Sequence, residues 1–148
     1  MPETNKTVEE FLAEHGEYAA TTSGISMYPL LRDKKYVVKI VPANERLKKY
    51  DVALFRRGKQ LVLHRVIKVF PDRYFIRGDN CDGGEYVFDS QIVGLLSEIN
   101  GKDRHVKVED TSYILYSRFT VYFFPIRYFA KKIYRFVRSV AKRILKGT

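Results

Sequence analysis

Two side chains in the first half of the sequence have the chemistry of a nucleophile and its general base. Ser26 follows Gly24 and precedes Pro29, a setting that favours a sharp, exposed turn from which a hydroxyl can reach a carbonyl carbon. His64 lies in an apolar run, 61–67, whose alternation is typical of a strand. An imidazole with an ordinary pKa of about 6.5 is neutral near neutral pH, so it can accept the serine proton.

Both residues also have an ordinary structural explanation, a turn serine and a hydrogen-bonded core histidine, so the catalytic interpretation depends on further groups. The segment 78–85 supplies three carboxylates, Asp79, Asp82 and Glu85. Any of them could orient His64 and stabilise its imidazolium form. The same segment is also typical of tight turns, and its spacing does not fit a calcium-binding EF-hand loop. We therefore expect no metal site and no cofactor.

The chain has the length of one domain. Its 148 residues can bury a core without cross-links, and the single cysteine, Cys81, allows no intramolecular disulfide. The N-terminal segment carries acids where a secretion signal needs a basic start, and Arg118 and Arg127 interrupt the most apolar stretch, 113–130. We therefore expect neither a secretion signal nor a classical membrane span.

The sequence divides into three segments. In residues 1–17, Thr7 and Glu10 have the spacing of a capping box and Gly16 would end a short helix. Residues 18–110 form a predicted β-rich domain, in which runs of Val, Ile, Tyr and Phe are separated by Pro, Gly, Asn and Asp. A hairpin turn is predicted at 56–59. The predicted strands are 35–41, 51–56, 61–69, 73–77, 92–99 and a last one near 105–109.

Residues 111–148 are predicted to form a basic amphipathic helical tail. They hold nine Lys and Arg and no acid, whereas residues 1–110 hold 18 basic and 17 acidic residues, so most of the net charge of +10 belongs to the tail. After Pro125, apolar residues recur at helical spacing. Such a helix is suited to an anionic membrane surface, although it could instead pack on the body. The basic residues expected at a membrane include Lys131, Arg135, Arg138 and Lys142. Nucleic-acid binding is disfavoured, because phosphate contacts require no apolar stripe.

Four short motifs resemble those of the type I signal peptidases. In order they are Ser26-Met27-Tyr28-Pro29, Asp51-Val52-Ala53-Leu54-Phe55, His64-Arg65-Val66 and Gly78-Asp79-Asn80. A histidine base, where the common bacterial enzymes carry lysine, is similar to the Ser-His branch of archaea, the endoplasmic reticulum and some Gram-positive bacteria. The related LexA-like autoproteases also use lysine. The resemblance implies a coiled, mainly antiparallel β-fold of the signal peptidase/LexA type, with the substrate bound as an extended strand and small residues before the cut.

The resemblance also implies roles for individual residues. Ser26 would be the nucleophile and His64 the general base, and Asp79 matches the carboxylate of the family's Gly-Asp-Asn motif. Glu85 stands where the Ser-His branch usually has aspartate, so either Asp79 or Glu85 is expected to orient His64. Gly24 stands where many relatives have a serine that helps to form the oxyanion hole, which leaves backbone donors, chiefly the N–H of Ser26.

The sequence therefore predicts a serine endopeptidase that cleaves leader or signal-like segments of a peptide or protein precursor. We expect it to be attached peripherally to an anionic membrane through the C-terminal helix, on the cytoplasmic side if the chain is not exported. Two alternatives stay open. One is a non-catalytic peptide- or membrane-binding module on the same fold. The other is a LexA-like regulator that cleaves itself, for which the first 17 residues are too few to supply a DNA-binding domain.

Overall fold

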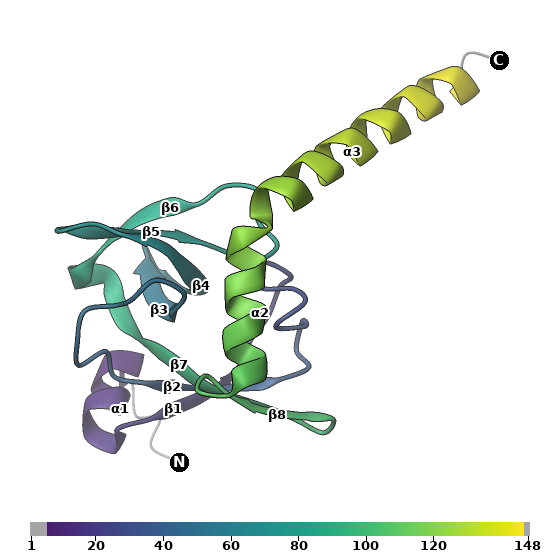
Figure 1. Ribbon diagram of the computed structural model, residues 1–148. Helices are drawn as coiled ribbons and strands as arrows, with labels where there is room; N and C mark the ends of the chain where they lie inside the picture. Colours follow the sequence, from purple (N-terminus) through teal and green to yellow (C-terminus); the bar gives the residue numbers. More distant parts are fainter. Residues whose placement is uncertain (1–5, 147–148) are drawn as a thin grey trace.

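An eight-stranded antiparallel sheet forms the centre of the protein. The structure is a computed structural model that describes residues 6–146 (Figure 1). The strands are β1 (Tyr18–Thr21), β2 (Val37–Val41), β3 (Val52–Arg57), β4 (Gln60–Val69), β5 (Arg73–Arg77), β6 (Glu85–Phe88), β7 (Ile92–Gly101) and β8 (Arg104–Lys107). They follow the order β1-β2-β7-β3-β4-β5-β6, and β8 pairs with β7 outside this path. The prediction of a mainly β protein is thus confirmed.

The first helix, α1 (Val8–His15), begins and ends where the sequence predicts. The Thr7 hydroxyl accepts a hydrogen bond from the Glu10 N–H at 3.2 Å, and the Glu10 carboxylate accepts one from the Thr7 N–H at 2.9 Å. This reciprocal pair is the capping box. Gly16 ends the helix at a φ of 74°, a left-handed conformation that glycine adopts without steric cost. Leu12 then anchors the helix in the core.

Six strands coincide with predicted segments to within a few residues, whereas β1 and β6 were not predicted. Each of the two is short, and neither has a clear apolar alternation. The predicted hairpin turn also lies slightly later than expected. β3 continues through Arg57, Gly58 takes a φ of 58°, and β4 begins at Gln60.

Buried apolar side chains form two clusters on the two sides of β3. Leu54 belongs to the first cluster, with residues from β2, β7 and the segment before β2, whereas Ala53 and Phe55 belong to the second. Successive residues of a strand point to opposite sides, so the alternation along β3 separates the two clusters. The second cluster also contains Leu47, Val66, Tyr74, Ile76 and Val87.

Two helices follow the sheet. α2 (Thr111–Tyr122) runs along one side of the strands, whereas α3 (Phe124–Lys146) leaves the body and projects beyond it (Figure 1). The helical conformation is interrupted between them at Phe123. Pro125 lies in the first turn of α3, where proline is tolerated because the backbone N–H that it lacks would have no partner within the helix. None of the α3 side chains is buried. Within residues 6–146, no helix has both the length and the apolar character to cross a membrane.

A buried ion pair joins α2 to the sheet. Arg65 of β4 donates from Nε and Nη2 to the two carboxylate oxygens of Asp79, each at 2.7 Å, and both side chains are almost completely shielded from solvent. Arg65 Nη1 also donates to Ser117 Oγ of α2 at 2.8 Å and to the Tyr50 carbonyl at 3.0 Å. Burial raises the pKa of the Tyr116 hydroxyl, which keeps its proton and donates to Asp79 at 3.1 Å.

We expect single substitutions of this pair to destabilise the protein strongly. Arg65→Met or Asp79→Leu leaves a buried charge without its partner, and either change should lower the free energy of unfolding by about 3–5 kcal/mol. The double substitution should cost less than the sum of the two. Urea denaturation followed by circular dichroism measures these values.

A surface ion pair provides the control. Lys35 and Asp103 interact at 2.8 Å with both side chains well exposed, so Lys35→Met should cost at most about 1 kcal/mol. Equal losses for Lys35→Met and Arg65→Met would contradict the structural role of the buried pair.

Candidate active site

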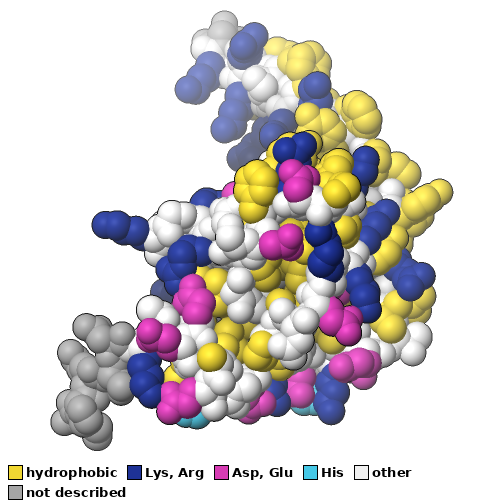
Figure 2. Space-filling view, turned by 90° about the vertical axis from the view of Figure 1, so that its left-hand side faces the viewer, with side chains coloured by type: hydrophobic (Ala, Val, Ile, Leu, Met, Phe, Trp, Pro, Cys, Tyr) yellow, Lys and Arg dark blue, Asp and Glu magenta, His cyan; other side chains and the backbone are white. Residues whose placement is uncertain are grey.

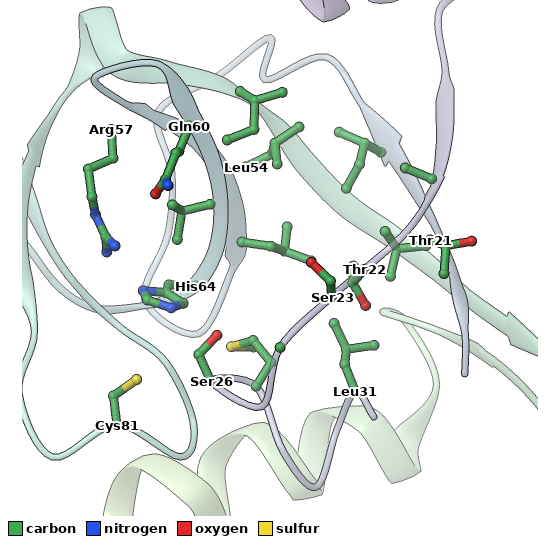
Figure 3. Close-up of a pocket in the computed structure, with 18 of the residues that line it drawn as sticks. Thr21, Thr22, Ser23, Ser26, Leu31, Leu54, Arg57, Gln60, His64 and Cys81 are labelled. Carbon is green, nitrogen blue, oxygen red and sulfur yellow. The ribbon is translucent and has the colours of Figure 1, made fainter. Parts of the chain in front are cut away.

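A groove with a volume of about 900 Å³ lies beside the first core cluster. Its walls come from β1, β2, β3 and β4, from residues 22–27, and from the turn before β6. Ser26 and His64 both line it, and the Ser26 hydroxyl points towards the imidazole ring (Figure 3). The groove therefore holds the predicted nucleophile and the predicted base in one open space.

Close packing at Gly78 brings the site together. A Cβ atom added there would lie 2.6 Å from the Ser26 carbonyl oxygen, 2.8 Å from Cys81 Sγ and 3.0 Å from His64 Nε2. The Asn80 N–H donates to the same Ser26 carbonyl at 2.8 Å. Since only glycine leaves room for this approach, Gly78 has a physical reason to open the Gly-Asp-Asn turn.

The imidazole of His64 is mostly buried, and its environment favours the neutral form. Burial lowers the pKa of His64, and the positive charge of Arg57 lowers it further, while the negative charge of Glu85 acts in the opposite direction. The Nδ1 atom of His64 is buried and has no hydrogen-bond partner among residues 6–146. The nearest Glu85 oxygen is 3.9 Å away, too far for a hydrogen bond. A neutral imidazole is the protonation state that a general base needs.

Glu85 lies between Arg57 and His64 and is hydrogen-bonded to Arg57. Arg57, at the end of β3, donates from Nε to Glu85 Oε2 at 2.9 Å and from Nη2 to Glu85 Oε1. The same Oε1 is the atom that faces His64 Nδ1. A small movement of the Glu85 carboxylate away from Arg57 would bring it within hydrogen-bond distance of the imidazole.

The two acids that the sequence left as alternatives have different places in the structure. Both oxygens of Asp79 accept hydrogen bonds from Arg65. The Asp79 carboxylate therefore belongs to the buried ion pair that joins the sheet to α2. Glu85 lines the groove and faces Nδ1 of His64. The geometry therefore favours Glu85 as the acid beside the imidazole. Asp79 positions the turn on which Gly78 lies.

The backbone N–H groups of Gly24 and Ser26 differ in whether they already have an acceptor. The Gly24 N–H donates to Asp33 Oδ1 at 2.7 Å, and Gly24 has a φ of 92° that a side chain would strain. Gly24 therefore shapes the turn, and its N–H is already engaged. The N–H of Ser26 has no acceptor within residues 6–146, so it stays available for an oxyanion.

Three basic residues of α3 contact the turn 79–82, which follows Gly78. Arg127 donates to the Asp79 carbonyl at 2.5 Å, and Lys131 donates to Asn80 Oδ1 at 2.9 Å. Arg135 forms an ion pair with Asp82. Lys131 and Arg135 were expected at a membrane surface; in the structure both contact the turn 79–82, with Arg135 still exposed, and the membrane contact stays a prediction. Of the other two residues expected there, Arg138 and Lys142, neither forms an ion pair within the described part of the chain.

Two strand edges open onto the groove. Within residues 6–146, β1 pairs only with β2, and residues 60–64 of β4 pair only with β3, because pairing with β5 begins at Arg65. Both edges line the groove. Their free backbone N–H and C=O groups can bond to an extended peptide, which is the way in which strands are added to a sheet.

Neither a family model nor a curated protein matches this sequence. Within the described residues, no group of three or more His, Cys, Asp or Glu side chains is placed to hold a metal ion. The function is therefore inferred from the arrangement of Ser26, His64 and Glu85 in the groove.

The contacts of Gly78 predict that any side chain at this position destabilises the protein. In Gly78→Ala the new methyl group meets a backbone oxygen of Ser26, which cannot move without shifting the turn. Such overpacking should lower the free energy of unfolding by about 1–3 kcal/mol and shift the NMR resonances of the His64 ring. Gly83→Ala is the matched control, because a Cβ atom there meets nothing within 4 Å. Equal stability of the two variants would contradict the close approach.

The pKa of His64 is expected to lie below the ordinary value of 6.5. Arg57→Gln should raise this pKa, because it removes a positive charge and frees Glu85. Glu85→Gln should lower it, because the imidazolium loses a nearby negative charge. An NMR titration of the imidazole resonances measures all three proteins. An unchanged pKa in both variants would show that Arg57 and Glu85 do not act on His64.

Proposed function

We propose that this protein is a serine endopeptidase in which Ser26 is the nucleophile and His64 the general base. The observation that carries the proposal is the convergence of the two residues at Gly78 inside an open groove. It agrees with the resemblance of the four motifs to the Ser-His branch of the signal peptidases. The finer fold assignment, a sheet of the signal peptidase/LexA type, belongs to the same proposal.

The reaction follows the logic of other serine peptidases. Ser26 Oγ attacks the scissile carbonyl carbon while His64 Nε2 takes the hydroxyl proton. The negative charge that develops on the carbonyl oxygen is stabilised by the Ser26 N–H. The imidazolium then gives its proton to the leaving amine as the peptide bond breaks. In the second half, His64 takes a proton from the water that attacks the acyl-enzyme and then gives it to Ser26 Oγ as the ester bond breaks, which releases the new carboxyl terminus.

Glu85 completes the site when the imidazole becomes charged. Protonation of His64 places a positive charge beside Glu85 and strengthens the attraction across the present 3.9 Å. Arg57 competes for the same oxygen, and its positive charge disfavours the imidazolium. The acid is therefore expected to act by moving from Arg57 towards His64 during the reaction.

The groove suits a stretched segment of a peptide or protein precursor. The open edges of β1 and of residues 60–64 supply backbone hydrogen bonds to an extended chain, independent of its side chains. Side-chain selection then depends on how deeply the groove admits each residue. Together with the resemblance, this favours leader or signal-like segments with small residues before the cut.

A fluorophosphonate probe tests the nucleophile without knowledge of the substrate. We expect wild-type protein to be labelled at Ser26, as located by mass spectrometry, and Ser26→Ala to give no labelling. His64→Ala should slow labelling by roughly a hundredfold or more, because the hydroxyl loses its base. Ser90→Ala removes an exposed serine that does not line the groove, and this variant should react like wild type.

Peptide cleavage provides the second measurement. Incubation with a mixture of proteome-derived peptides should produce new termini in wild type and none in Ser26→Ala. Absence of labelling and cleavage would overturn the peptidase proposal, and retained peptide binding would then indicate the non-catalytic module. Cuts confined to the chain itself would indicate a self-cleaving regulator.

A further inference from the structure

The projecting helix α3 carries an apolar stripe that nothing in the described structure covers. The stripe consists of Ile126, Phe129, Ile133, Phe136, Val137, Val140 and Ile144, each at least 38% exposed. Their spacing follows the helical period, so they lie on one side of the helix. A continuous apolar surface of this kind on a folded protein marks an interaction site.

The stripe continues onto α2. Tyr113 and Ser117 of α2 are buried against the sheet, whereas Ile114, Leu115, Phe119 and Tyr122 are exposed. Figure 2 shows apolar side chains in a band that passes from the projecting helix down one edge of the body, with Lys and Arg on the other flank of the projecting helix. We call this combined surface of α2 and α3 the helical face.

The charges of α3 divide into two groups. Arg127, Lys131 and Arg135 contact the turn 79–82. The other basic residues of α3 form no ion pair within residues 6–146, and residues 111–148 contain no acid that could neutralise them. This second group consists of Lys132, Arg138, Lys142, Arg143 and Lys146.

We infer that the helical face lies on an anionic membrane surface. Its apolar side chains can enter the boundary between headgroups and acyl chains, where Phe and Tyr are favoured, while its unpaired Lys and Arg contact lipid phosphates. An anionic membrane can therefore cover the apolar side chains and neutralise the unpaired positive charges at the same time. The inference concerns binding alone and stands apart from the proposed catalysis.

Two other occupants fit less well. A second copy of the chain would cover the apolar stripe, but it would also bring two sets of unpaired positive charges together with no acid on either tail. A nucleic acid would neutralise the charges, but it would leave the aliphatic part of the stripe exposed to water. Anionic lipid is the one chemistry that matches both features.

The contacts of α3 with the body give this docking a direction. Arg127, Lys131 and Arg135 hold the first turns of the helix against the turn that carries Asp79 and Asp82. If a membrane binds along the helical face, these contacts fix the orientation of the groove relative to the membrane.

A single tryptophan can report insertion, because the chain contains none. In Phe129→Trp, the fluorescence should shift to shorter wavelength when vesicles of phosphatidylcholine mixed with phosphatidylglycerol are added, and much less with phosphatidylcholine alone. Tyr86→Trp is the control, since Tyr86 is exposed on β6, outside the helical face. A shift in both variants, or in neither, would overturn the inference.

Charge and apolar variants separate the two halves of the interaction in a vesicle sedimentation assay. Lys132→Gln/Arg143→Gln, at two exposed positions that flank the apolar stripe, should weaken binding to the mixed vesicles by on the order of tenfold. Lys59→Gln/Lys102→Gln removes the same charge from exposed sites elsewhere and should have little effect. Ile133→Ser/Phe136→Ser should reduce binding at unchanged charge.

Two further measurements test the rival occupants. Sedimentation equilibrium without lipid should show a monomer, and binding to single-stranded DNA should be weak at physiological salt. A tight dimer that Ile133→Ser/Phe136→Ser dissociates would assign the face to a second copy. Tight DNA binding without vesicle binding would assign it to nucleic acid. Either result would overturn the membrane inference, and neither would bear on labelling of Ser26.

Discussion

The ion pair between Arg65 and Asp79 is the interaction on which the arrangement of the site depends. Arg65 directly follows His64 in β4, and Asp79 directly follows Gly78 in the turn. Since successive strand residues point to opposite sides, Arg65 reaches into the protein while His64 faces the groove. The pair thus connects the strand that carries His64 to the turn that packs against Ser26, and Ser117 and Tyr116 connect both to α2. Catalysis needs positions fixed to a fraction of an ångström, and this buried network supplies such constraint.

Much of the fold could be predicted because local chemistry determines it. The capping box at Thr7 and Glu10, the long apolar strands and the helical spacing after Pro125 all follow from contacts between residues close in sequence. The strands β1 and β6 escaped prediction because neither short segment has a clear apolar alternation, so only their pairing with β2 and β5 identifies them as strands. The order of the strands depends on the same long-range pairing.

The site was predicted in part. Ser26, His64 and the acidic turn were found from residue types and from the order of the motifs, and the structure places them around one groove. The sequence could not distinguish Asp79 from Glu85, because the distinction depends on Arg65 and Arg57, which occupy the two carboxylates. A charged residue in an apolar strand, such as Arg65, was a signal that a buried partner existed. The contacts of Lys131 and Arg135 with the turn had no sequence signal, because they depend on where α3 leaves the body.

The contacts of α3 with the turn 79–82 link the projecting helix to the groove. With 23 residues the helix is roughly 35 Å long, yet its contacts with the turn are confined to its first three turns. These contacts reach Asp79, Asn80 and Asp82, and the Asn80 N–H donates to the Ser26 carbonyl. The projecting helix is therefore coupled to the backbone of Ser26 through this one turn.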